Sequence, residues 1–504
     1  MVALNISKLI ALVLAPTAVL GSFAIQQIQK NQHQTQVKAI LGTGGESVLG
    51  GPTPYWIDQP LDHFSPKSNG TFRQKYFFND QYYKPGGPVW LFVGGEVPLD
   101  GGWVTSTGMV LFTLANKTNG IMAAIEHRYY GDSMPFPDYS TKNMAYLSSH
   151  QAIEDIVAFV KNFTATHNLP SCTKWIPVSG SYPGDLAAWL RELYPDIFWA
   201  AYSSSAPLRA KADFFEYSLA VRQGIPKIGG SEVCLNNLIR TVSLFDAALK
   251  RDPKGTRRYL GLGSIELDGD VGSMLPTSAL AGSVQFGPSA QFYNSSVTHI
   301  SAACSGKYFP SFANPNATDS QLWTDLQRWM YGYLDGMGII PNNATELAAL
   351  ETKNMADPSN SYRPWCWQTC TEFGFFQDAE HVQAPVYSKT VNMAYYKRAC
   401  AILFGKDHQN PHVAQTNKRY RGTNIKTSRI SFVNSEIDPW HMLSIYNRTS
   451  TDAQPVFLHD EFHCLDMYAP RPDDTPLLSK VKVEVMAAWD KFMAGDTCRS
   501  QLAN

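Results

Sequence analysis

The chain has 504 residues, and its 42 basic side chains almost balance its 43 acidic ones. This balance offers no strongly basic surface, so the composition does not indicate nucleic acid or an anionic membrane as a partner. Aromatic residues make up 12% of the chain and charged residues only 17%, which is typical of a globular protein with two or three domains and a large core.

The N-terminal segment 1–24 has the pattern of a secretory signal peptide. Lys8 precedes an almost wholly apolar run, Leu9 to Leu20, and small residues follow it. The run is short for a transmembrane helix, although an uncleaved anchor is the alternative. No second long apolar run follows, so we expect no stable membrane insertion. Residues 25–51 are rich in Gln and then in Gly, which predicts a flexible or propeptide segment.

Two further features agree with export from the cell. Seven glycosylation sequons follow the predicted signal, at Asn69, Asn116, Asn162, Asn294, Asn316, Asn343 and Asn447. The eight cysteines form an even set, which favours structural disulfides in an oxidising compartment. Cys366 and Cys370 have the spacing of half a zinc site, but no second such pair accompanies them, so we expect no metal.

Strands and helices alternate up to residue 208. Mixed aromatic residues at 55–83 predict short antiparallel strands, and apolar runs at 88–93, 121–125, 175–178 and 199–203 predict buried strands. Helical spacing appears at 148–167 and again after Ser181. This alternation predicts a mostly parallel sheet with helices on both faces. Pro177 has no N–H for a strand ladder, so we expect a bulge or an early strand end there.

The pattern changes after residue 208. Helical segments at 214–221, 234–249 and 322–334 are separated by Gly- and Pro-rich joints, and four cysteines lie between 304 and 400. We therefore predict that residues 209–411 are an inserted helical cap pinned by disulfides. Strand patterns resume at 429–433 and 455–458, before a helix at 478–492. The core would then comprise residues 52–208 and 412–504.

A small-residue corner joins the strand at 175–178 to the following helix. Ser181 lies at its apex, which is how hydrolases hold a serine hydroxyl clear of the backbone for nucleophilic attack. An ordinary turn that contains serine is the alternative. Ser179 and Ser203 to Ser205 also lie near strand ends, but none lies at the apex of such a turn.

A serine nucleophile needs a base, and the base needs an orienting carboxylate. Asp438 follows the strand at 429–433 and His463 follows the strand at 455–458, in the order Ser, acid, His that doubly wound hydrolases use. We predict that these three residues form a triad. His441 and His459 are the rivals of His463.

Backbone amides should stabilise the oxyanion. The N–H of Tyr182 follows the nucleophile, and a second N–H is expected from the Gly94-Gly95-Glu96 loop, at Gly95. Glu96 is either a ligand for a substrate amino group or a structural or solvated carboxylate.

Five motifs together resemble one family: Gly180-Ser-Tyr with Gly184, Gly94-Gly-Glu96, Glu126-His-Arg-Tyr-Tyr-Gly131, Asp438-Pro-Trp-His441 and His463-Cys-Leu-Asp466. They resemble the lysosomal Pro-Xaa carboxypeptidase family, which includes prolylcarboxypeptidase, dipeptidyl peptidase 2, thymus-specific serine protease and fungal prolyl endopeptidases. The resemblance spans about 56–489. It implies an α/β-hydrolase core with a helical cap, the same triad, and cleavage after proline, usually at acidic pH.

Three positions depart from the family pattern. Ser179 and Pro183 stand where the family usually has Gly and Gly or Ser, and Asp185 stands where an apolar or small residue lines the pocket for the residue before the cut. These departures weaken the expectation of strict proline specificity more than the expectation of hydrolysis. Trp440 is either a wall of that pocket or a core residue.

The sequence therefore predicts a secreted, lysosomal or vacuolar serine peptidase that cuts after proline in peptides or proteins, without cofactor or nucleic acid. Carboxypeptidase and endopeptidase modes remain open. The alternatives are a dipeptidyl peptidase, an esterase or lipase, and a silent hydrolase fold used for binding. A homodimer is compatible with each of them.

Overall fold

The computed structural model describes residues 53–65, 70–259, 300–336, 361–494 and 498. The predicted signal peptide, the segment 25–51 and the sequons at Asn69, Asn294 and Asn343 lie outside the described residues. The other four sequon asparagines, Asn116, Asn162, Asn316 and Asn447, are exposed. Across the described part of the chain, no helix has the length and apolar character needed to cross a membrane.

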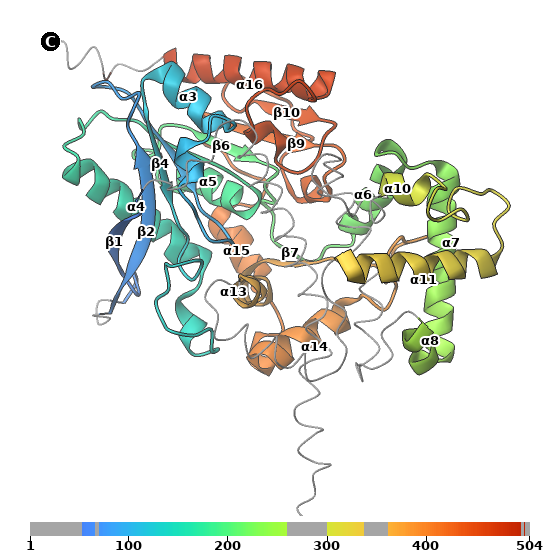
Figure 1. Cartoon of the computed structure of the whole chain (residues 1–504). Helices are drawn as coiled ribbons and strands as arrows, with labels where there is room; N and C mark the ends of the chain where they lie inside the picture. The colour runs from blue at the N-terminus through green and yellow to red at the C-terminus, as the bar shows by residue number, and fades with distance from the viewer. Residues whose placement is uncertain (1–52, 66–69, 260–299, 337–360, 495–497, 499–504) are drawn as a thin grey trace, which may run out of the picture.

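An eight-stranded sheet forms the centre of the molecule, in the order β1-β2-β4-β3-β5-β6-β9-β10 (Figure 1). The edge pair β1 and β2 is antiparallel, as the sequence predicts for 55–83, and all strands from β4 to β10 run parallel. The strands are β1 (Tyr55–Pro60), β2 (Thr71–Asn79), β3 (Val89–Val93), β4 (Ile121–Ile125), β5 (Trp175–Gly180), β6 (Ala201–Ser204), β9 (Ile430–Ser435) and β10 (Val456–His459).

Helices cover both faces of this sheet, because both faces of its central strands are apolar. In β3, Val89, Leu91 and Val93 pack with α4 (Ser149–Thr166) and α5 (Ser181–Leu193) on one face. Trp90 and Phe92 pack with α3 (Val110–Thr118) and α16 (Pro476–Ala494) on the other. This alternation confirms the prediction of a doubly covered sheet.

Pro177 lies within a continuous β5 and still pairs with Leu91 of β3. The irregularity appears on the β6 side. Between the bridge Trp175–Phe198 and the pair Val178–Tyr202, β5 advances three residues while the neighbouring chain advances four. A bulge therefore lies opposite the proline, as expected for a residue without an N–H.

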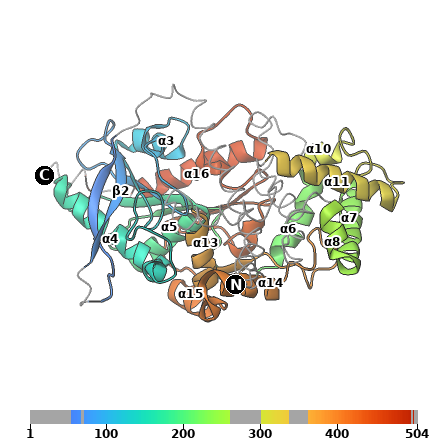
Figure 2. The same ribbon diagram turned by 60° about the horizontal axis from the view of Figure 1, so that its bottom comes forward.

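The chain between β6 and β9 is mainly helical. In Figures 1 and 2, α7, α8, α10 and α11 form the end of the molecule away from the sheet, while α13, α14 and α15 lie nearer to it. Two short strands, β7 (Lys211–Asp213) and β8 (Gly374–Phe376), pair in parallel, which the sequence did not predict. The helices are α6 (Glu216–Gly224), α7 (Glu232–Arg251), α8 (Pro253–Tyr259), α10 (Ile300–Cys304), α11 (Asp319–Gly336), α13 (Tyr362–Gln368), α14 (Met393–Phe404) and α15 (Val413–Tyr420).

Three disulfides confirm the prediction of structural disulfides, but for six of the eight cysteines only. Cys234–Cys304 and Cys370–Cys400 lie within the segment between β6 and β9, and Cys172–Cys498 ties the C-terminus to the core. Cys366 and Cys464 remain buried thiols. Because Cys370 is in a disulfide, the Cys366 and Cys370 pair is not half of a zinc site.

Candidate active site

The turn between β5 and α5 has the strained geometry of a nucleophile elbow. Ser181 adopts φ of +61°, a conformation that side chains other than glycine rarely take. A Cβ on Gly180 would lie 2.6 Å from Sγ of Cys464, and a Cβ on Gly184 would lie 3.0 Å from the Ser204 carbonyl oxygen. Glycine at these two positions lets neighbouring loops close tightly around Ser181.

The rival serines are all buried and hydrogen-bonded. Ser179 Oγ donates to the carbonyl oxygen of Val93, Ser203 Oγ to that of Gly184, and Ser204 Oγ to a carboxylate oxygen of Asp466. The hydroxyl oxygen of Ser205 accepts the N–H of Cys464. Ser181, in contrast, is partly exposed at the apex of the turn. Of these five hydroxyls, that of Ser181 is the one placed to meet a substrate.

Asp438 and His463 meet beyond the carboxyl ends of β9 and β10. Nδ1 of His463 lies 2.7 Å from Oδ2 of Asp438, and both side chains are buried. The other carboxylate oxygen, Oδ1, accepts the N–H of Trp440 at 3.1 Å and so caps the short 3₁₀ helix Pro439–Leu443. The carboxylate is thereby fixed, and it holds the imidazole ring of His463 in one orientation.

The two rival histidines bind elsewhere. Nδ1 of His441 bonds the backbone carbonyl oxygen of Asp438, not its carboxylate. Nδ1 of His459 accepts the N–H of Glu461, and its Nε2 lies 3.5 Å from Asp466. Asp466 also accepts hydrogen bonds from the hydroxyls of Tyr202 and Ser204, so His459 belongs to a buried network beside the sheet.

The residue after His463 connects its loop to the elbow. Cys464 takes the left-handed conformation, with φ of +60°, and donates its N–H to Ser205 at 3.2 Å. Its sulfur lies against Gly180, the residue before Ser181. This contact brings the loop after β10 directly beside the turn after β5.

The surroundings of His463 favour its protonated, positively charged form. Burial alone would disfavour the imidazolium, but the Asp438 carboxylate, with Cys464 beside it, outweighs burial and raises the pKa of His463 well above its ordinary value. A stabilised imidazolium is what a base needs after it has taken a proton from a serine hydroxyl.

The predicted oxyanion donors lie on the other side of Ser181. The N–H of Tyr182 is in the first turn of α5, where backbone amides have no partner within the helix. In the loop after β3, Gly94 already donates its N–H to the carbonyl oxygen of Ile125, whereas Gly95 is the residue predicted as the donor. A Cβ on Gly95 would lie 2.3 Å from Cγ of Pro183, so this loop packs directly on the residue after Tyr182.

A second buried histidine, His127, lies behind Tyr182. Its Nδ1 must carry the proton, because it bonds the carbonyl oxygen of Arg128 at 2.7 Å. Burial lowers the pKa of His127 to about 4, so the ring is neutral and its Nε2 accepts the Tyr182 hydroxyl at 2.9 Å. The sequence assigned no role to His127, although it lies in the Glu126 to Gly131 motif.

The rest of that motif supports the fold. Arg128 makes two bonds of 2.6 Å to Asp155 on α4 and also binds the carbonyl oxygens of Leu61 and Tyr146. Glu126 accepts from Leu99 and forms an ion pair with Lys75 at 2.9 Å. These contacts fasten the loop after β4 to the edge of the sheet.

The three candidate substrate ligands differ in their surroundings. Glu96 is 7% exposed and follows Gly95. Asp185 is fully buried one helical turn after Ser181, and neither of its carboxylate oxygens has a hydrogen-bond partner among the described residues. Trp440 is partly exposed and packs at ring distances of 5.4–5.7 Å against Phe214, Tyr217 and Phe375.

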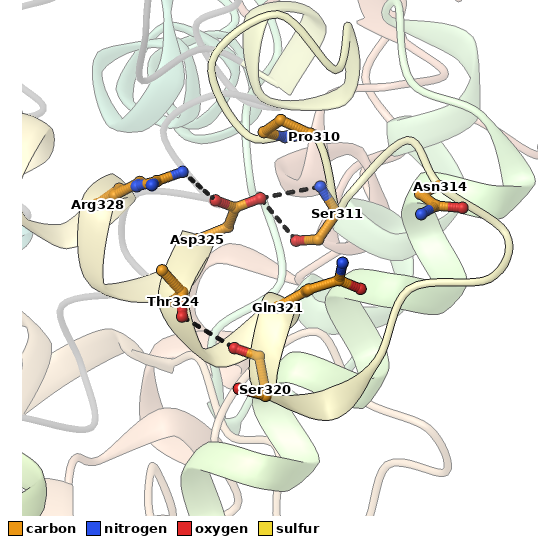
Figure 3. Close-up of a pocket in the computed structure, with 8 residues that line it drawn as sticks. All are labelled: Pro310, Ser311, Asn314, Ser320, Gln321, Thr324, Asp325 and Arg328. Carbon is orange, nitrogen blue, oxygen red and sulfur yellow. Dashed lines mark hydrogen bonds and ion pairs between the residues drawn. The ribbon is translucent and has the colours of Figure 1, made fainter.

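A separate polar pocket of about 290 Å³ lies between α11 and the segment 310–314 (Figure 3). Its central carboxylate, Asp325, accepts the N–H and the hydroxyl of Ser311 and pairs with Arg328 at 3.1 Å. This pocket is in the segment between β6 and β9, and none of the predicted catalytic residues lines it. Within the described ranges, no group of three or more His, Cys, Asp or Glu side chains is arranged to hold a metal ion.

The order and direction of the strands, with a strained serine at the β5–α5 turn, place the protein among the α/β hydrolases. The chain belongs to the serine carboxypeptidase S28 family, whose model matches residues 59–485. It is therefore a serine peptidase by family.

The relatives agree with this family. The chain is 32% identical to a Caenorhabditis elegans protein named as a serine protease, over 86% of this chain and 87% of that one. It is 31% identical to the thymus-specific serine protease of Mus musculus, over 90% of each. It is 27% identical to a protein of Arthroderma benhamiae named "Probable extracellular serine carboxypeptidase", over 93% of this chain and 70% of that one.

Proposed function

We propose that Ser181, His463 and Asp438 are the catalytic triad of this peptidase. The observation that carries the proposal is the buried pair of His463 and Asp438, 2.7 Å apart, on a loop whose next residue packs against Gly180. No rival serine is both exposed and unengaged, and no rival histidine contacts the Asp438 carboxylate.

In this mechanism, Ser181 Oγ attacks the carbonyl carbon of the peptide bond while Nε2 of His463 takes its proton. Asp438 stabilises the resulting imidazolium, and the N–H groups of Tyr182 and Gly95 bind the oxyanion. His463 then gives the proton to the departing amine. Water attacks the acyl-enzyme in a second, equivalent step, with His463 again as the base.

We further propose that the preferred bond follows a proline. The support is the family membership and Trp440, which lies two residues from Asp438 and presents an aromatic face at a partly exposed position. The segment 209–411 would act as the cap over this cleft and would decide between release of single C-terminal residues, release of dipeptides and internal cuts.

Secretion is the proposed destination. Four described sequons are exposed, three disulfides are present, and one relative is named as extracellular. A lysosome or vacuole is the other predicted destination.

A fluorophosphonate probe tests the triad. The wild-type protein should be labelled, and Ser181→Ala should not be. Ser179→Ala and Ser203→Ala serve as matched controls and should still be labelled, because their hydroxyls are engaged within the fold. Labelling that persists in Ser181→Ala would overturn the assignment.

Mass spectrometry of the products from a mixed peptide library, at pH 4 and pH 7, tests the substrate. Cuts that cluster after proline support the proposal. Cuts without any enrichment of proline would contradict it. Hydrolysis of esters in the absence of any peptide cleavage would favour the esterase alternative.

A further inference from the structure

Asp185 is a buried acid to which no described residue donates a hydrogen bond. It lies on α5, four residues after Ser181, which is about 6 Å along the helix axis at 1.5 Å per residue. It is 0% exposed, and neither carboxylate oxygen accepts a hydrogen bond from any described residue. Buried carboxyl groups are normally paired, because an unpaired one carries the full cost of lost hydration.

The neighbouring charge makes this position more unusual. Burial raises the pKa of Asp185 well above its ordinary value, and Glu96, in the loop that carries the predicted oxyanion donor Gly95, raises it further. This loop packs on Pro183, two residues before Asp185, so the segments that carry the two acids meet at the turn between β5 and α5.

Four buried basic side chains of the core are engaged elsewhere and form no hydrogen bond with Asp185. Arg128 is paired with Asp155, and Lys75 is paired with Glu126 and Asp132. Arg191, on the same helix as Asp185, donates to the backbone carbonyl oxygens of Pro195, Phe198 and Ser428. His127, whose pKa Glu96 also influences, is neutral.

We propose that Asp185 and Glu96 form an anionic subsite that binds a protonated amino or guanidinium group of the substrate. The inference rests on the proposed nucleophile, since the subsite is defined by its distance from Ser181. Two sources have this chemistry and can span one helical turn from the attacked carbonyl: a Lys or Arg side chain near the cut, and the free amino terminus of a short peptide.

The charge balance of binding follows directly. In the empty subsite, burial and the nearby Glu96 favour the protonated form of the Asp185 carboxyl. A cationic group favours the ionised form, so Asp185 releases this proton to solvent when the substrate binds. Affinity for a cationic substrate should therefore rise with pH, and affinity for a neutral analogue of the same shape should not.

Matched peptides test the proposal. The two peptides of the first pair differ only in having lysine or norleucine at one position near the cut. The two peptides of the second pair differ only in having a free or an acetylated amino terminus. Wild type should show a higher kcat/KM for the cationic member of one pair, by about 10- to 100-fold. Asp185→Asn should remove this ratio, mainly through KM. Asp196→Asn, which removes an exposed acid just after the same helix, should keep it.

The two pairs also identify the source of the cation. If Asp185→Asn loses the kcat/KM ratio of the lysine pair, the subsite binds a side chain. If Asp185→Asn loses the ratio of the acetylation pair, the subsite binds the amino terminus. Equal ratios in wild type and Asp185→Asn, for both pairs, would overturn the inference.

A binding experiment separates this inference from the proposed mechanism. Calorimetry with Ser181→Ala measures the affinity for the same four peptides without turnover. If Ser181→Ala prefers the cationic peptide and Ser181→Ala/Asp185→Asn does not, the subsite stands even if another serine proves to be the nucleophile. If neither variant has a preference, the subsite fails, whatever the fluorophosphonate result.

Discussion

The loops on the two sides of β5 bring buried histidines to the same turn, but their surroundings shift the two pKa values in opposite directions. On the β4 side, burial outweighs the charges near His127 and lowers its pKa to about 4. On the β10 side, His463 is equally enclosed, yet Asp438 raises its pKa well above the ordinary value. One carboxylate at 2.7 Å thus accounts for the upward shift at His463, and it supports the proposal that His463 is the base.

The two sides accordingly suit different parts of the reaction. The β3 and β4 side presents backbone N–H groups and a neutral ring that holds Tyr182, which suits stabilisation of an oxyanion. The β9 and β10 side presents a charge-stabilised imidazole, which suits proton transfer. Four changes to the protein or its conditions would test this division of roles.

Removal of the carboxylate should have the largest effect. Asp438→Asn should lower kcat/KM by about 10⁴-fold, because the imidazolium loses its stabilising charge and the ring its fixed tautomer. The pKa of His463, followed by NMR, should fall towards that of His127. An unchanged His463 pKa in this variant would show that Asp438 does not set its charge state.

The second largest effect is expected from displacement of the loop after β3, which carries the proposed oxyanion donor Gly95. Gly95→Ala places a Cβ within 2.3 Å of Pro183, so the loop must move and kcat should fall by about 10²-fold. The double variant Gly95→Ala/Pro183→Ala removes the two closest ring atoms and should recover part of the rate. Steady-state kinetics on one peptide compares the three proteins, and the absence of any recovery would argue against this contact.

The neutral state of His127 should make the stability of the fold depend on pH. The unfolded chain protonates His127 below its ordinary pKa of about 6.5, whereas the folded protein does so only below about 4. Stability should therefore be fully present above pH 6.5 and should fall by about 3 kcal/mol as the pH drops to 4. Urea unfolding at several pH values gives the free energy of unfolding of wild type and of His127→Gln, and the variant should lack this loss of stability. The same pH dependence in both proteins would contradict the neutral state of His127.

The charged histidine should limit activity at low pH. Since the base must be neutral, kcat/KM should fall about tenfold for each pH unit below the pKa of His463, with a midpoint above 6.5. His127 should add no inflection near pH 4. A pH profile of kcat/KM on an uncharged peptide measures both. A maximum at pH 4 to 5, as the family resemblance implies, would contradict the raised pKa.

Local sequence patterns predicted much of the framework. Buried strands appear as apolar runs because both faces of the sheet are covered, so β3, β4 and β5 were found within one or two residues. The elbow at Ser181 was visible because a strand, a small-residue corner and a helix are consecutive in the chain. The bulge opposite Pro177 followed from its missing N–H.

Other features depend on residues that are distant in sequence. The even number of cysteines predicted disulfides, but only the packing excluded Cys366 and Cys464 from pairing. Leu193, the last residue of α5, is 38% exposed, because the helix ends there at the surface. The strands β7 and β8 are three residues long and leave no periodic pattern.

The sequence by itself determined the sheet, the elbow and the order Ser, acid, His, because each is written in a contiguous stretch or in chain order. Only the tertiary structure decided which histidine meets Asp438, that His127 is neutral, and that no described residue donates a hydrogen bond to Asp185. Hydrogen-bond partners and burial are set by loops that converge from distant parts of the chain. A charge state depends on those neighbours, and no local pattern records them.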